Sequence, residues 1–266
     1  MKVKNTIPNY PVKVLDKSLS ILEVLLKKNS LMSITEISNK LGMYPSTVHR
    51  ILNTLKNRGY VEQDSQNQKY QLGLKLIELG MAKFYKIDLV EEATPFLKEL
   101  VSKCNEIVHL GILEQGEVLY LAKEEPNQTI RMVSKIGKRV PVYSTSLGKI
   151  LLAYLSKNNL KAITDKIKYI SFTKNTINST DKLEKELIKV KKQGFALDVE
   201  ENEKDVCCIA VPIRNYQGKV VAAISISSPI YRLNIKKKRY LTENIVSISK
   251  KISERLGYIK KKYIRE

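Results

Sequence analysis

The first recurring hydrophobic pattern lies between residues 16 and 28 and has the spacing of an α-helix. Asp16 is predicted to be its N-cap, because a short acidic side chain accepts hydrogen bonds from free backbone N–H groups. Lys27 and Lys28 suit the negative end of the helix dipole. The apolar face is predicted to consist of Leu19, Leu22 and Leu26, broadened by Ile21 and Leu25.

Two more helices are predicted between residues 33 and 59. Ser33 and Glu36 have the spacing of a capping box, which predicts a helix that begins beside them. Gly42 is predicted to end this helix, and Pro45 to begin the next, since proline is favoured in a first helical turn. Gly59 is predicted to stop the third helix. Its buried stripe is predicted to be Val48, Ile51, Leu52 and Leu55.

A hairpin pattern follows the third helix. Residues 60–63 and 69–72 alternate like strands, and the polar residues 64–68 between them are typical of a turn. Helix, helix, tight turn, helix and hairpin is the order of a winged helix-turn-helix, predicted here over residues 1–73. Residues 74–87 return to helical spacing and are predicted to be a linker helix.

The remaining residues, 88–266, mix strand and helix patterns. Such a mixture predicts an α/β sheet with helices packed on it, so the whole chain is assigned to the α+β class. Strands are predicted at 107–113, 118–123, 129–135, 207–214 and 220–227, and helices at 147–155, 182–193 and 240–256.

Composition narrows the class of protein. Hydrophobic residues make up 43% of the 266 residues, enough for two cores, and no apolar run approaches the ~20 residues of a membrane helix. The start has no apolar signal region, so we expect a cytoplasmic protein without membrane association. Cys104, Cys207 and Cys208 form no framework of spaced pairs, and with two histidines no metal site or cofactor is predicted.

The formal net charge of +20 favours a polyanionic partner. Residues 236–266 carry eleven Lys/Arg against three Asp/Glu, whereas residues 1–74 carry eleven against five. Charge therefore does not single out the N-terminal region as the DNA reader. An architectural DNA binder driven by the basic tail around Lys260–Lys262 stays open as an alternative, as does a general lysine bias.

The third helix carries the residues that point to double-stranded DNA. Opposite its apolar stripe lie short polar side chains and a cation, which suit a helix that enters the major groove. An ordinary solvated face is the alternative, but the flanking capped helix, tight turn and hairpin favour DNA. The predicted DNA-binding residues are Pro45, Ser46, Thr47, His49, Arg50, Asn53 and, in the hairpin, Lys69.

Ordered sequence blocks resemble the IclR family of transcription regulators. The first runs from Ser33 through Ser46-Thr47-Val48-His49-Arg50-Ile51-Leu52 to Gly59-Tyr60-Val61-Glu62 and Tyr70-Gln71-Leu72-Gly73. The others are Ile136-Gly137-Lys138-Arg139 with Pro141 and Gly148-Lys149, then Gln193-Gly194-Phe195 to Cys208-Ile209-Ala210, and Ala222-Ala223-Ile224-Ser225-Ile226-Ser227-Ser228-Pro229.

The resemblance implies a GAF-like effector-binding domain over residues 88–266, which binds a small organic acid. It also implies homodimers or homotetramers that act on palindromic operators. The family's pocket positions fall on Met132, Val140, Ser146, Leu147, Asp198, Val206, Cys208, Ser225 and Ser227.

These residue types also suit the task chemically. Ser225 and Ser227 are two apart on a strand, so both hydroxyls point to one face and can donate to a carboxylate. Asp198 can accept from a ligand hydroxyl, and Cys208 is a small apolar wall. The alternative is that the serines are merely small residues on a buried strand. Cys207 is expected to face away from Cys208, and a redox-sensing pair stays a minor alternative.

A narrower likeness concerns Val108-His109-Leu110-Gly111, Arg131 to Pro141 and Tyr143 to Lys149. These segments resemble the subgroup that controls the use of pectin and 2-keto-3-deoxygluconate, which would make the effector a sugar acid such as 2-keto-3-deoxygluconate.

The function predicted from these patterns is a DNA-binding repressor controlled by a small carboxylate. An enzyme using Ser225, Cys208 and Asp198 is the alternative from another class. A nucleophile needs an adjacent base, however, and His109 is the only histidine outside the third helix, so no catalytic residues are predicted.

Overall fold

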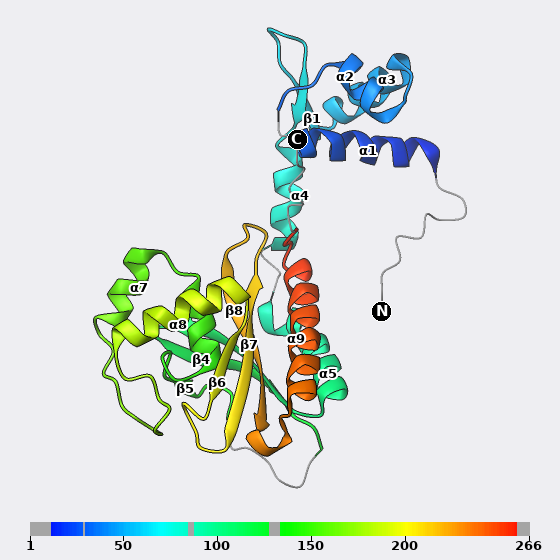
Figure 1. Cartoon of the computed structure of the whole chain (residues 1–266). Helices are drawn as coiled ribbons and strands as arrows, with labels where there is room; N and C mark the ends of the chain where they lie inside the picture. Colours follow the sequence, from blue (N-terminus) through cyan, green and yellow to red (C-terminus); the bar gives the residue numbers. More distant parts are fainter. Residues whose placement is uncertain (1–11, 29, 85–87, 128–133, 260–266) are drawn as a thin grey trace. The chain divides into compact units, whose positions relative to one another are not determined.

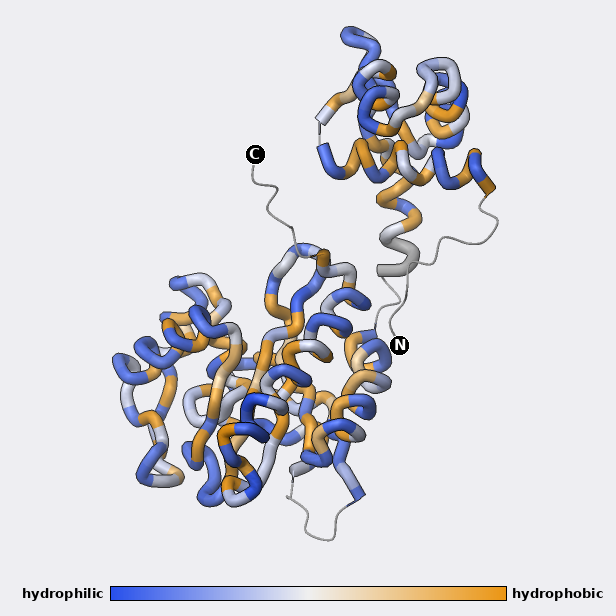
Figure 2. The backbone as a smooth tube through the Cα atoms, turned by 45° about the vertical axis from the view of Figure 1, so that its right-hand side comes forward, coloured by the Kyte–Doolittle hydropathy of each residue, from blue (hydrophilic) through white to orange (hydrophobic). Residues whose placement is uncertain are grey.

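The computed structural model describes residues 12–28, 30–84, 88–127 and 134–259. The chain divides into two compact units, residues 1–86 and 87–266, which are described separately here. Hydrophobic positions recur through both units (Figure 2), as expected if each has its own core. Among the described helices, none combines the length and apolar character needed to cross a membrane.

The first unit has the predicted order of elements (Figure 1). Strands β1 and β2 pair antiparallel, with Val61 opposite Leu72. Apolar residues from the helices and the hairpin pack into one core around Ile37, Leu52 and Tyr70. The elements are α1 (Lys13–Lys28), α2 (Ile34–Leu41), α3 (Pro45–Asn57), β1 (Val61–Gln63), β2 (Tyr70–Leu72) and α4 (Lys75–Phe84).

Local capping chemistry sets the boundaries of α2 and α3. The Ser33 hydroxyl accepts from the Glu36 N–H at 3.2 Å, and the Glu36 carboxylate accepts from the Ser33 N–H at 2.8 Å, so the capping box is confirmed. Gly42 ends α2 with φ 63°, a left-handed conformation that glycine adopts without a steric penalty. Pro45 opens α3 as predicted.

The prediction for α1 was wrong in two respects. The helix begins at Lys13, so Asp16 lies in its first turn and favours the positive end of the dipole rather than capping it. The buried residues are Ile21, Val24 and Leu25, whereas Leu19 and Leu26 are exposed. Helix α1 is apolar on more than one face, so periodicity alone could not choose the face that meets the core.

The second unit is a six-stranded antiparallel sheet in the order β5-β4-β3-β8-β7-β6. Its strands are β3 (Ile107–Glu114), β4 (Glu117–Glu124), β5 (Arg139–Val140), β6 (Ala196–Val199), β7 (Val206–Arg214) and β8 (Val220–Pro229). Its helices are α5 (Leu89–Cys104), α6 (Ser146–Ala153), α7 (Lys157–Thr164), α8 (Thr180–Gln193) and α9 (Ile235–Arg255), with a 3-10 turn, η1 (Ile230–Arg232).

Helices cover both faces of this sheet (Figure 1). Helices α5 and α9 pack together on one face, and α6 and α8 lie over the other. Strand β3 alternates accordingly, because Val108 and Leu110 join the core beneath α5 and α9 while His109 lies on the opposite face. The α+β class and the helix-covered sheet are confirmed.

Some elements differ from the sequence expectations. Helices α5 and α7 and strand β6 were not predicted. Of the strand expected at 129–135, residues 129–133 lie outside the described part, and Ser134 and Lys135 form no strand.

Candidate functional site

Helix α3 presents its polar residues to solvent, while Val48, Ile51 and Leu52 are buried beneath it. Tyr44 occupies the N-cap position without a side-chain cap. Pro45 has no N–H and the Thr47 N–H donates to the Tyr44 carbonyl at 3.0 Å, so the Ser46 N–H is the one in this first turn that suits an external acceptor. The positive end of the helix dipole lies there, which favours a phosphate. Of the residues predicted to bind DNA, those exposed are Pro45, Ser46, His49, Arg50 and Asn53.

The other two predicted residues are half-buried. Thr47 lies in the first turn of α3, and Lys69 lies in the turn of the β1–β2 hairpin, where its N–H donates to Asn67 at 2.9 Å. Tyr44 was missed by the sequence reading, although its side chain is 81% exposed directly before α3. Its position directly before the helix places it next to the polar face of α3.

The second unit contains a cavity between the sheet and the N-terminus of α6. Its volume is about 60 Å³, so a ligand of several carbons requires the surrounding side chains to move apart. Met132 lies outside the described residues. The other predicted effector residues all line this cavity: Val140, Ser146, Leu147, Asp198, Val206, Cys208, Ser225 and Ser227.

Strand register explains why these residues meet. Ser227 lies opposite Cys208, and Cys208 lies opposite Asp198, so the three form one row across β8, β7 and β6. Directly opposed residues on paired strands point to the same face, with their Cβ atoms ~5 Å apart. The Cys208 thiol donates to the Ser227 hydroxyl at 3.2 Å. Cys207 pairs instead with Ser228 and does not line the cavity.

Helix α6 aims its N-terminus at this row. The Thr145 hydroxyl accepts from the Gly148 N–H at 3.2 Å and caps the helix. The N–H groups of Ser146 and Leu147 precede that bond and have no carbonyl four residues earlier within the helix. With the dipole and the serine hydroxyls, they make this end of the cavity suited to a carboxylate.

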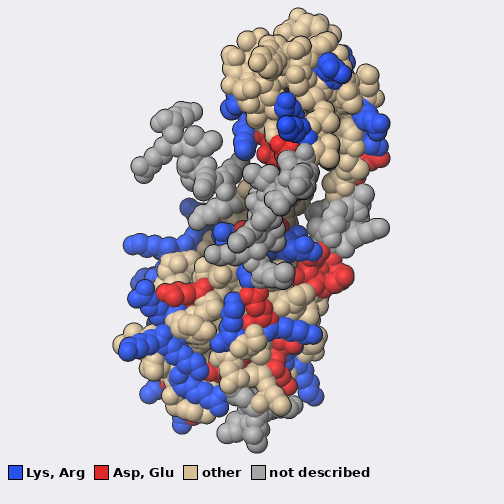
Figure 3. Space-filling model, turned by 90° about the vertical axis from the view of Figure 1, so that its right-hand side faces the viewer, with Lys and Arg blue, Asp and Glu red and all other residues tan. Residues whose placement is uncertain are grey.

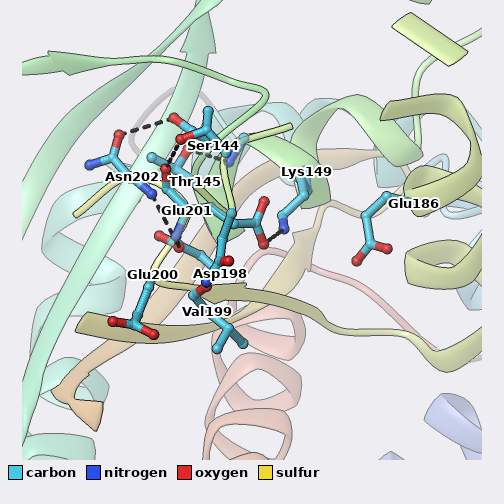
Figure 4. A network of polar contacts seen from close by, with 12 residues as sticks. Ser144, Thr145, Lys149, Glu186, Asp198, Val199, Glu200, Glu201 and Asn202 are labelled. Atoms are coloured by element: carbon cyan, nitrogen blue, oxygen red, sulfur yellow. Dashed lines mark hydrogen bonds and ion pairs between the residues drawn. The ribbon is translucent and has the colours of Figure 1, made fainter. Parts of the chain in front are cut away.

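Asp198 is the buried acidic group of the cavity, whose lining also includes the exposed Glu203. The Asp198 Oδ1 accepts from the N–H groups of Glu201 and Asn202 at 2.8 and 3.4 Å (Figure 4). Burial raises the pKa of this carboxyl to about 7, despite those hydrogen bonds, which favour the charged form. Asp198 therefore exchanges a proton near neutral pH and can be a donor or an acceptor.

A buried ion pair lies beside Asp198. The Lys149 side chain is fully buried on α6, and its Nζ lies 2.6 Å from Oε1 of Glu201 (Figure 4). Lys149 thus holds the loop residue whose N–H binds Asp198. Sequence reading quoted Lys149 only within a family block, because nothing in the sequence shows where its amine finds a partner.

The loop after β6 is held from several sides. The hydroxyls of Thr173 and Thr176 donate to the carbonyls of Glu200 and Glu201, and the Ser144 hydroxyl donates to Asn202 at 3.0 Å. These bonds come from segments far apart in sequence. They fix the loop at the edge of the cavity, where Asn202 and Glu203 contribute to the lining.

Several lining residues were not predicted, among them His109, Tyr120, Ser134 and Lys138. They come from β3, β4 and the segment before β5. His109, Ser134 and Lys138 fall within sequence blocks that resemble the family or its subgroup, but nothing in those blocks marks them as cavity residues. The rarity of histidine in the chain was a further signal for His109.

The chemistry of Cys208 does not suit a nucleophile. Burial raises the pKa of its thiol well above the ordinary value, so it stays protonated near neutral pH. The thiol instead serves as a donor to Ser227 and a wall of the cavity.

A winged helix-turn-helix joined in one chain to a second, α/β domain defines a class, the two-domain transcription regulators. Two family models match the chain, the IclR helix-turn-helix domain over residues 14–65 and the bacterial transcriptional regulator IclR C-terminal domain over residues 81–254. The chain belongs to the IclR family of transcription regulators and is not an enzyme.

Relatives match over nearly the full length. The chain is 36% identical to the regulator XynR of Escherichia coli over 247 residues. The aligned region covers 93% of this chain and 98% of XynR. The chain is 38% identical over 242 residues to the E. coli regulator KdgR, covering 91% and 92%. Assignment to a subgroup within the family stays a prediction, although KdgR is among the matched relatives.

Solved structures agree with the fold. The Thermotoga maritima IclR is 32% identical and superposes with a TM-score of 0.62, covering 93% of this chain and all of that one. The C-terminal domain of E. coli KdgR is 34% identical with a TM-score of 0.60, covering 65% and 100%. The Agobacterium tumefaciens repressor BlcR shares the fold, with a TM-score of 0.81 and 24% sequence identity. The superposition covers 94% of this chain and 99% of BlcR.

Proposed function

We propose that this chain is a repressor whose operator binding is controlled by a small organic or sugar acid, such as 2-keto-3-deoxygluconate, held in the cavity of the second unit. The observation that carries this proposal is the meeting of the α6 N-terminus with Ser225, Ser227 and Asp198 around one cavity. The N-terminus of α6 and the hydroxyls of the two serines supply hydrogen-bond donors for the carboxylate of the effector. Asp198 pairs with a hydroxyl or carbonyl group of the effector.

The DNA-reading surface is the polar face of α3 with the hairpin. Ser46 lies where the helix dipole attracts a phosphate, and Arg50 can donate a bidentate pair to guanine or phosphate. His49 and Asn53 contact one another at 3.4 Å and share this face. Lys69 is positioned by the hairpin and contacts the phosphate backbone, and Tyr44 extends the surface before the helix.

Homodimers, or tetramers built from them, would present two such helices to the halves of a palindrome. The first unit has apolar surface available for this purpose. Leu15, Leu19 and Leu26 of α1 and Ile77 of α4 are each at least half exposed, and exposed apolar surface of this kind favours association where it is contiguous. This use explains the second apolar face of α1.

One face of the second unit bears on the alternative of an architectural DNA binder. On the face of the second unit drawn in Figure 3, lysines and arginines are interspersed with aspartates and glutamates rather than gathered in one track. Interspersed charges of both signs suit a solvated surface better than a continuous phosphate-binding path. The basic residues 260–266 lie outside the described part. We place the protein in the cytoplasm, where its DNA is.

Ligand control requires that the effector bind the DNA-competent and DNA-incompetent states with different affinities. The test begins with selection of binding sequences from random duplex DNA, followed by fluorescence anisotropy with the selected duplex. Pyruvate, gluconate and 2-keto-3-deoxygluconate are then added in turn. We expect at least one acid to change the operator Kd about tenfold, within the usual ~5–150-fold range of allosteric coupling.

Variants connect that effect to the cavity. Ser225→Ala with Ser227→Ala should abolish the response to the acid and leave DNA affinity without ligand unchanged. Ser247→Ala, an exposed serine on α9, is the matched control and should respond like the wild type. The proposal fails if every acid that binds the protein leaves the operator Kd unchanged.

A further inference from the structure

The cavity has a second polar end, built on β3 and β4, that the carboxylate-binding residues do not use. We propose that His109, held by Ser134 and Tyr120, binds a hydroxyl group on the carbon chain of the effector and so selects hydroxylated acids over plain 2-oxo acids. This inference rests on the proposed function, because it assigns a role within the same cavity.

Strand register places His109 beside the carboxylate end. His109 on β3 lies directly opposite Ser225 on β8, and its ring lines the cavity. Opposed residues share a face of the sheet, so the imidazole and the Ser225 hydroxyl are neighbours. A ligand whose carboxylate is held by Ser225, Ser227 and the α6 N-terminus therefore extends either along the row from Ser227 toward Asp198 or across β3 toward His109.

The His109 ring is held in place before any ligand arrives. Its Nε2 lies 2.8 Å from the Ser134 hydroxyl, and the ring stacks on Tyr120 with centroids 4.7 Å apart and planes 20° apart. The Ser134 carbonyl in turn accepts from the Lys123 ammonium at 3.1 Å. A polar group fixed by its neighbours loses little freedom on binding, which is what a selective contact requires.

The ring also has unused hydrogen-bonding capacity. The side chain is 3% exposed, and within residues 12–28, 30–84, 88–127 and 134–259 its buried Nδ1 has no hydrogen-bond partner. Buried polar atoms are rarely left unpaired in native proteins. A ligand hydroxyl in this end of the cavity would join the Ser134–His109 network and supply the missing polar partner.

The protonation state of the His109 ring indicates which functional group of a ligand it would pair with. Burial, with the nearby Lys123 ammonium, lowers the pKa of His109 to about 4, so the imidazole is neutral near pH 7. A neutral imidazole has one donor and one acceptor nitrogen. An alcohol, which both donates and accepts, matches it, whereas a second carboxylate would match a charged histidine better. The ligand class is therefore a monocarboxylate with hydroxyls further along the chain.

The experiment compares two acids of equal carbon number by calorimetry with the full-length protein. 2-Keto-3-deoxygluconate carries hydroxyls, and 2-oxohexanoate carries none. We expect the wild type to bind the hydroxylated acid more tightly. His109→Phe keeps the stacked ring and removes both nitrogens. This substitution should raise the Kd for 2-keto-3-deoxygluconate roughly tenfold, a typical loss for one hydrogen bond. Binding of 2-oxohexanoate should change by less than about twofold.

Ser134→Ala should give a smaller loss of the preference for the hydroxylated acid, since the Ser134 side chain only orients the His109 ring. Ser134 also lies outside the strands, so its loss should disturb the fold little. His109→Gln, which retains a donor and an acceptor, should restore part of the preference. Thermal melts without ligand check that each variant folds. If the His109 variants do not fold, the effect of Ser134→Ala on selectivity tests the inference. Equal weakening of both acids by Ser134→Ala and His109→Phe would overturn the inference and indicate a structural role.

Outcomes for the inference and for the proposed function are separable. If Ser225→Ala abolishes binding of both acids while His109→Phe leaves both unchanged, the inference is wrong and the carboxylate site stands. If Ser225→Ala with Ser227→Ala leaves both acids bound as in the wild type, the proposed cavity itself is wrong.

Discussion

The two units of this protein arrange their polar residues in opposite ways. In the first unit, the predicted DNA contacts lie within nine consecutive residues of one helix, apart from Lys69, and most are exposed. In the second, the polar groups of the cavity come from β3, β4, α6, β6, β7 and β8 and are mostly buried. A surface that meets a large charged partner needs no burial, whereas a small acid must be enclosed to be recognised.

The difference predicts where substitutions are costly. A polar residue on α3 is solvated whether or not DNA is present, so its loss should affect binding alone. A polar residue around the cavity supports the second unit as well as the ligand, because its partners are buried and would be left unpaired. Three experiments test this comparison, the largest expected effect first.

Replacing Lys149 by Met should have the largest effect. It leaves the buried Glu201 carboxylate without its partner, and removal of one member of a buried pair costs about 3–5 kcal/mol. Chemical denaturation followed by tyrosine fluorescence should show the loss. The second unit should unfold at lower denaturant concentration, with the first unit unaffected.

Lys161→Met, at an exposed position on α7, is the matched control and should change the free energy of unfolding by under ~0.5 kcal/mol. If Lys149→Met is equally mild, the ion pair does not hold the cavity loop and the contrast between the units is weaker than stated.

Arg50→Ala should have an intermediate effect confined to DNA binding. Loss of a guanidinium contact to a base costs about 1–3 kcal/mol, which is roughly 5- to 150-fold in Kd, and relaxes the sequence preference at one position. Anisotropy with the selected duplex and with single-base variants measures both. Lys185→Ala, exposed on α8, serves as the control. A fall in the midpoint of thermal unfolding similar to that of cavity variants would contradict the comparison.

The pH dependence of ligand binding should be the mildest effect. The pKa of Asp198 is raised to about 7 by burial, so below pH 7 the group is mostly protonated and does not repel an anionic ligand. Affinity should therefore fall as pH rises through 7, by at most about tenfold per unit. Calorimetry in buffers of different ionisation enthalpy should detect proton uptake on binding above pH 7.

Stability should follow the same direction, because a carboxyl whose folded pKa lies above its unfolded value stabilises the native state at low pH. That contribution is complete below about pH 4 and is lost as pH rises through about 7. Asp198→Asn should flatten the binding profile between pH 6 and 8 and the stability profile between about pH 4 and 7. Unchanged profiles in this variant would assign the titration to another group.

The sequence by itself determined most of the first unit. Ser33, Glu36, Gly42 and Pro45 act on neighbours within a few residues, so their spacing predicts where α2 and α3 begin and end. The polar face of α3 could be listed for the same reason. What failed was the choice of the buried face of α1, since Leu19 and Leu26 are as apolar as the residues that meet the core.

Tertiary structure decided the cavity. Resemblance to a family pointed to Asp198, Cys208, Ser225 and Ser227, and alternation on a strand put the two serines on one face. Only the register of β3 against β8 brings His109 beside Ser225, across more than a hundred residues. Likewise, only the packing of α6 on the sheet joins Lys149 to Glu201. Contacts of this kind depend on which strands pair and in what register, which a pattern along the chain does not record.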